Sequence, residues 1–164
     1  MQVFRQKAMS YDRSKAQAEN NRMSESNKQV IHAFIEDVLN KGLFNRANDL
    51  VKEDFVELDP LPGQQQGREG LKAVIHALRT AFPDMHWVVI EMVAEDEKVV
   101  TRFEWTGTHR GVFLGIPATG SSVKVKGVVI DRLENGMMTD SRILMDTMGL
   151  MQQLGVIPAP PPAG

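Results

Sequence analysis

The sequence predicts an α+β domain in which helices pack on one face of a curved antiparallel sheet. Apolar residues recur at helical spacing between Val30 and Leu39, and again between Leu71 and Leu78. From Met85 onward the apolar spacing changes to two, which is typical of strands. Helical patterns therefore come first and long strands follow, as expected when helices cover one side of a sheet.

Three helices and a short strand are expected in the first half of the chain. Ser26 and Gln29 have the spacing of a capping box, so we expect the first helix to begin at Ser26 and to end at Gly42. The elements that follow are a short helix at 44–52, a strand at 55–60 and a helix from 71 to 82.

Four long strands are expected in the second half, at 85–94, 98–109, 121–134 and 137–146. Asn135-Gly136 predicts a tight hairpin between the last two strands. The apolar residues change faces around Gly127, which predicts a β-bulge that curves the sheet. A curved sheet covered by helices can enclose a mainly apolar pocket with a few polar groups.

The 164 residues suit one domain, with a polar arm at 1–23, the folded domain at 24–157 and a proline-rich tail at 158–164. The net charge of −2 gives no basic field for nucleic acid, and no apolar run has the length of a membrane span. No stretch resembles a signal peptide, so we expect a cytoplasmic protein. The absence of cysteine and the scattered spacing of the four histidines argue against a metal site.

The last strand carries the first candidate functional residue. If its side chains alternate regularly, Asp140, Arg142, Leu144 and Asp146 share one face. Asp146 then ends a mostly apolar strand, immediately before an apolar helix at 147–154. A carboxylate in such a place is costly unless it is paired, hydrogen-bonded or functional. Asp146 can cap the helix, act in chemistry, or do both.

Five short motifs occur in an order that is specific as a set. They are Gly67–Leu71, Ala81–Asp84, Gly107–Gly111, Leu114–Gly120 and Asp146–Gly155. Together with the order of the elements, they resemble the SnoaL-like polyketide (ester) cyclases of the nuclear transport factor two-like superfamily. The resemblance covers about residues 27–157.

The resemblance implies a cone-shaped α+β barrel around an apolar pocket, and a homodimer formed through the outer face of the sheet. Characterised cyclases of this kind close a ring of an aromatic polyketide methyl ester by intramolecular aldol condensation, with neither a metal nor an organic cofactor. The ligand would be a small hydrophobic or carbonyl-bearing molecule. Asp146 matches the family's acid/base aspartate, and His109 matches another pocket residue.

Such chemistry needs a base beside the carbon that loses its proton and donors beside the enolate oxygen that develops. An apolar cavity raises the pKa of an aspartate and so makes Asp146 a better base. His109 would hydrogen-bond the substrate oxygen or Asp146; alternatively, it is a loop-edge histidine satisfied by the backbone. Phe103 and Trp105 either wall the pocket or belong to the core, and Leu144 is expected to contact the substrate.

Two positions depart from the family pattern. Arg142 stands where members commonly have Trp, and Leu58 stands where many have His. We expect Arg142 to bind an anionic oxygen of the ligand at one end of the pocket, unless a bulge turns it to solvent. Because of these departures, a non-catalytic ligand-binding or interaction module on the same fold is an alternative. Isomerase, dehydratase or epoxide hydrolase chemistry is a further alternative, because related folds host all three.

Overall fold

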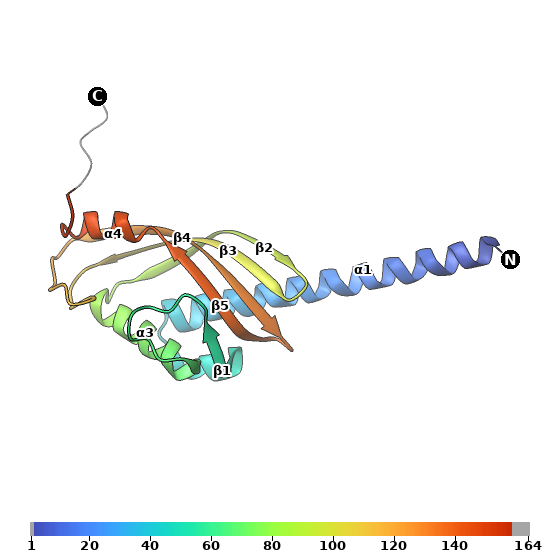
Figure 1. Cartoon of the computed structure of the whole chain (residues 1–164), viewed down its shortest axis with the longest axis horizontal. Helices are drawn as coiled ribbons and strands as arrows, with labels where there is room; N and C mark the ends of the chain where they lie inside the picture. Colours follow the sequence, from blue (N-terminus) through green and yellow to red (C-terminus); the bar gives the residue numbers. More distant parts are fainter. Residues whose placement is uncertain (1, 159–164) are drawn as a thin grey trace, which may run out of the picture.

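The helices pack against one face of a five-stranded sheet with the strand order β1-β5-β4-β3-β2 (Figure 1). The structure is a computed structural model that describes the backbone of residues 2–158 and side chains from residue 15 onward. The strands are β1 (Val51–Glu57), β2 (His86–Glu95), β3 (Lys98–Thr108), β4 (Ser122–Glu134) and β5 (Met137–Met145). The α+β class predicted from the sequence is confirmed.

The helical elements lie mostly before the sheet in the chain. They are α1 (Gln2–Ala33), a π-helical segment η1 (Phe34–Asn40), a 3₁₀ turn η2 (Phe44–Arg46), α2 (Ala47–Leu50), α3 (Gly67–Ala81) and α4 (Thr147–Gln153). None of the helices within residues 2–158 is long and apolar enough to cross a membrane. The proline-rich tail predicted at 158–164 lies outside the described residues, except for Pro158.

The predicted start of the first helix at Ser26 is wrong, because α1 runs through this residue without a break. No proline or glycine occurs between Gln2 and Lys41, so nothing in the sequence stops the helix before Gly42. Gly42 has a φ of 70° and follows the last helical turn, as predicted. In Figure 1 the N-terminal part of α1 extends well beyond the sheet.

Four strands form antiparallel neighbours as predicted, and Asn135-Gly136 makes the hairpin between β4 and β5 with positive φ at both residues. The sheet is nevertheless mixed, because β1 pairs with β5 in parallel. The predicted bulge at Gly127 is wrong: the pairing of β4 is regular there. A Cβ at Gly127 would lie 2.5 Å from the Phe103 ring, so close packing accounts for this glycine.

Candidate functional site

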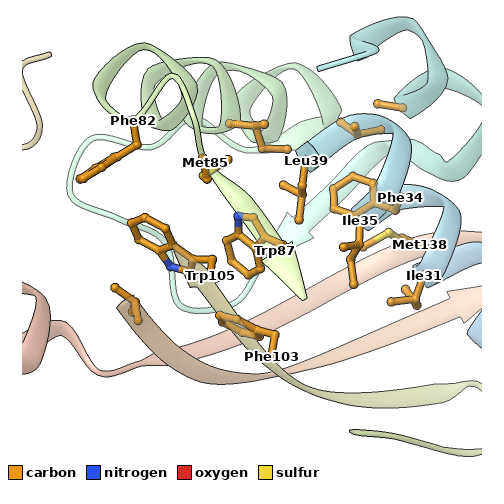
Figure 2. Packing of buried hydrophobic residues seen from close by; sticks show 14 of the residues in the cluster. Ile31, Phe34, Ile35, Leu39, Phe82, Met85, Trp87, Phe103, Trp105 and Met138 are labelled. Carbon is orange, nitrogen blue, oxygen red and sulfur yellow. The ribbon is translucent and has the colours of Figure 1, made fainter. Parts of the chain in front are cut away.

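A cavity of about 340 Å³ lies between the helices and the inner face of the sheet. Apolar side chains from α1, η1 and three strands form much of its wall (Figure 2). Examples are Ile31, Phe34, Leu39, Trp87, Phe103 and Met138. The volume falls within the range of small-molecule sites, at the lower end.

Three of the polar side chains in the cavity wall form one row across the sheet. Glu57 on β1 is the register partner of Ser141 on β5, and Ser141 lies opposite Asp131 on β4. All three residues are buried and line the cavity. Because adjacent strands lie about 4.8 Å apart, the row brings two carboxyl groups and a hydroxyl into one small region.

Asp131 is the most strongly perturbed acid of the site. Asp131 is 2% exposed, and burial raises the pKa of its carboxyl to about 7. A hydrogen bond with the Ser141 side chain lowers this pKa, whereas the charges of Glu57 and Asp140 raise it. The Oδ1 atom has no hydrogen-bond partner among the described residues. Asp131 can therefore take up and release a proton near neutral pH, and its Oδ1 keeps an unused capacity to accept a hydrogen bond.

Glu57 is held at the end of β1 by Gln66, the residue that immediately precedes α3. The Gln66 side chain accepts a hydrogen bond from the Glu57 backbone N–H at 3.1 Å and donates one to its carbonyl at 3.3 Å. Burial raises the pKa of the Glu57 carboxyl, and the Asp59 N–H, which donates to Oε1 at 3.3 Å, opposes this. The second carboxyl of the row is thus also shifted toward its neutral form.

Asp146 caps α4, as one of the two sequence interpretations predicted. Its Oδ1 accepts a hydrogen bond from the Gly149 N–H at 2.8 Å. The residue is exposed and is not part of the cavity wall, although its neighbours Met145 and Thr147 are. The expectation that an apolar cavity surrounds this carboxylate is therefore wrong, and its catalytic role stays a prediction.

Arg142 also lies outside the wall of the cavity. Its side chain is 52% exposed, and its Nε is 2.9 Å from the Asp59 carboxylate. The register of β5 against β4 shifts between Met138 and Asp140, so the alternation that runs regularly from Asp140 to Met145 turns Ser141 inward and Arg142 outward. The expected position of Arg142 at one end of the pocket is wrong, and the alternative of a bulged strand is confirmed.

The remaining predicted residues divide between the wall and the core. Phe103 lines the cavity, and Leu144 lines it while 67% exposed, which places Leu144 at the opening. Trp105 is buried outside the wall, so the core interpretation holds.

His109 is also buried outside the wall. Its Nδ1 accepts a hydrogen bond from the Thr119 N–H at 3.3 Å, and its ring stacks on Phe82 with centroids 5.1 Å apart. His109 does not line the cavity and makes no hydrogen bond with Asp146. The alternative of a histidine satisfied by the backbone holds for Nδ1 alone, because Nε2 is buried without a partner among the described residues.

Comparison with known proteins identifies the family. Residues 29–154 match the family model of the SnoaL-like polyketide cyclases. The chain belongs to this family. Aklanonic acid methyl ester cyclase DnrD from Streptomyces peucetius is 30% identical in an alignment of 119 residues that covers 68% of this chain and 81% of the relative.

Solved structures agree with this assignment. TsrD from Streptomyces laurentii superposes with a TM-score of 0.75 at 28% identity, over 81% of this chain and 97% of TsrD. IdmH from Streptomyces antibioticus, described as a candidate polyketide cyclase, has a TM-score of 0.69 at 26% identity, over 79% of this chain and 98% of IdmH. Membership of the SnoaL-like cyclases supports a cyclase-type function in general and a small-molecule ligand.

Sequence reasoning missed Asp131 and Glu57, the buried carboxyls among the described side chains of this SnoaL-like protein. A signal for Asp131 exists, because it falls on the face of β4 that otherwise carries Val123, Val125 and Val129. Apolar residues on the opposite face of β4 obscured this alternation. Where side chains are described, no group of three or more His, Asp or Glu residues is placed to hold a metal ion.

Proposed function

We propose that the protein is a polyketide cyclase-type enzyme in which Asp131 moves the proton of an intramolecular aldol ring closure. The proposal rests on the Asp131 carboxyl, which is buried in an apolar cavity and has a pKa of about 7. General bases work best when their pKa lies near the working pH. The same carboxyl can return the proton as an acid later in the cycle.

The steps balance without a further reactant. The Asp131 carboxylate takes a proton from a carbon beside a carbonyl group, which leaves an enolate. The enolate carbon attacks a second carbonyl of the same molecule, so a carbon–carbon bond forms and an alkoxide remains. Asp131 then returns its proton to the alkoxide oxygen. The substrate is rearranged into a ring, and the enzyme is restored.

The neighbours of Asp131 have supporting roles. The Ser141 side chain lies opposite Asp131 on the neighbouring strand and lowers the pKa of its carboxyl, which partly offsets the effect of burial. The charge of Glu57 raises the proton affinity of Asp131, which strengthens it as a base. The apolar wall excludes water and favours a folded conformation of a flexible substrate.

The charges of the wall favour a neutral substrate. Its ionisable residues are Glu57, Asp59 and Asp131, and it contains no Lys, Arg or His among the residues described. A free carboxylate would meet like charges and no cation, whereas an ester avoids this repulsion. The Streptomyces peucetius relative is named for a methyl ester substrate, and we propose the same class here.

Solvent deuterium incorporation tests the proposal. We expect the protein to accelerate exchange into β-dicarbonyl compounds and to cyclise a polyketide methyl ester such as aklanonic acid methyl ester, measured by mass spectrometry against a buffer blank. Binding of these compounds without any accelerated exchange would contradict the proposal. That result would favour a ligand-binding module on the same fold.

We also propose that the protein forms a homodimer through the outer face of the sheet. Exposed apolar side chains on β2, β3 and β4 support this, namely Val88, Ile90, Val100 and Ile130. Sedimentation velocity at micromolar concentration should give a dimer, and a Val100→Lys variant should shift it toward the monomer. A wild-type monomer under these conditions would exclude the pairing.

A further inference from the structure

Two residues of the cavity wall carry buried polar side-chain atoms without a hydrogen-bond partner in the described part of the chain. One is Asp131, and the other is Trp87, whose indole Nε1–H has no acceptor. Trp87 is 7% exposed, so water does not readily supply that acceptor. Buried indole N–H groups usually find a partner, and the surrounding apolar side chains offer none.

The orientation of Trp87 is fixed by its neighbours. Its backbone N–H donates to the Asn40 Oδ1 at 2.7 Å, and the Asn40 Nδ2 donates to the Trp87 carbonyl at 3.0 Å. The indole packs on the Phe103 ring with centroids 4.3 Å apart and stacks near Trp105 at 6.2 Å. Figure 2 shows the indole nitrogen on the ring edge that lies away from Phe103, on the side of Met85 and of Leu39, which is another residue of the wall.

The sheet register separates Trp87 from Asp131. Trp87 lies opposite Trp105 on β3, whereas Asp131 lies opposite Val99. Six residues of strand span about 20 Å. The free donor and the free carboxyl oxygen therefore lie toward opposite ends of the cavity, as expected for two contacts with one elongated ligand.

We propose that the Trp87 indole N–H is a positioning group that binds a carbonyl oxygen of the ligand at the end of the cavity remote from Asp131. A hydrogen bond from a fixed donor strengthens binding most in an apolar wall, because no water competes there for the acceptor. The chemical class of the ligand is a neutral, aromatic or apolar molecule with a carbonyl group. The inference concerns binding and holds whether or not Asp131 catalyses a reaction.

Trp105 provides a matched control. Its indole N–H is also buried and unpartnered within the described residues, yet Trp105 is not part of the cavity wall. Trp87→Phe and Trp105→Phe each remove one such N–H and keep an aromatic ring. Only the first should remove a contact with the ligand.

Two probes of nearly the same shape separate hydrogen bonding from packing: 2-acetylnaphthalene carries a carbonyl, and 2-isopropenylnaphthalene carries a methylene in its place. By titration calorimetry, we expect Trp87→Phe to weaken ketone binding about fivefold and alkene binding less than twofold. Trp105→Phe should change both affinities less than twofold. Equal weakening of both probes by Trp87→Phe, or no weakening of either, would overturn the proposal.

Indole proton resonances give a second readout that needs no variant to bind. With ¹⁵N-labelled tryptophan, the Trp87 N–H signal of the wild type should move downfield with the ketone and not with the alkene. Trp87→Phe assigns that signal by its disappearance. A downfield shift of the Trp105 signal alone, or failure of the wild type to bind the ketone, would equally overturn the proposal.

Discussion

Asp131→Asn is expected to lower the rate of catalysed deuterium exchange by about 10²–10⁴-fold, the usual contribution of a general base. Asparagine keeps the shape of the side chain and can still pair with Ser141, but it cannot take up a proton at neutral pH. Substrate affinity should change much less, because the apolar wall is unaltered. Exchange rates and dissociation constants, measured on the same compounds, separate these two effects.

Asp146→Asn is the rival variant, since the family resemblance assigns the acid/base role to Asp146. Asparagine caps helices about as well as aspartate, so this variant should stay folded. Glu91→Gln serves as the control, because Glu91 lies exposed on β2 and pairs only with Arg102 in the residues described. Loss of exchange in Asp146→Asn with full exchange in Asp131→Asn would contradict our assignment and restore that of the resemblance.

The same Asp131→Asn variant should be more stable than the wild type above pH 7. The pKa of Asp131 is about 7 in the folded protein and near the ordinary value of 3.8 in the unfolded chain. Well below pH 3.8 the carboxyl is neutral in both states, so burial carries no charge penalty. As the pH rises from 4 to 7, the folded state holds the proton more strongly than the unfolded state, and stability falls.

The loss is complete once the pH exceeds the folded pKa. A difference of about three pKa units corresponds to about 4 kcal/mol of the free energy of unfolding. Urea denaturation at pH 8 should show Asp131→Asn more stable by up to that amount, and at pH 4 the two proteins should differ little. A variant that is less stable than the wild type at pH 8 would show that Asp131 is not a buried charge there.

If Asp131→Asn loses activity and gains stability, the two results together distinguish a functional role of Asp131 from a packing role. A residue that only packs the fold destabilises it when replaced, whereas a functional residue is often kept at a cost to stability. Asp131 occupies a position on β4 where an apolar side chain would fit the surrounding wall. The expected gain at pH 8 therefore supports a role for its carboxyl in chemistry.

Local sequence patterns predicted most of the fold. The alternation of β3, the Asn135-Gly136 turn and the proline after Phe82 each depend on a few neighbouring residues. The motif set pointed to the right family for the same reason, because each motif is a short local turn or cap. Asp146 as the cap of α4 was likewise predictable from the residues around it.

The site could not be predicted in the same way, because it depends on long-range pairing. Glu57 and Asp131 lie in one row, on either side of Ser141, only because β1 joins β5 in parallel, and no local pattern specifies that partner. The position of Arg142 depends on the register shift between β4 and β5. Likewise, the absence of an acceptor for the Trp87 indole N–H among the described residues can be seen only once the packing around the cavity is known.

The pH dependence of kcat/KM for deuterium exchange, corrected for the buffer blank, tests the central claim most directly. This parameter reports the free enzyme, so we expect it to rise tenfold per pH unit below a midpoint near 7 and to level off above it. Glu57→Gln should move the midpoint to lower pH, because it removes a like charge that raises the Asp131 pKa. A midpoint near 4, unchanged in Glu57→Gln, would contradict the assignment of Asp131 as the base.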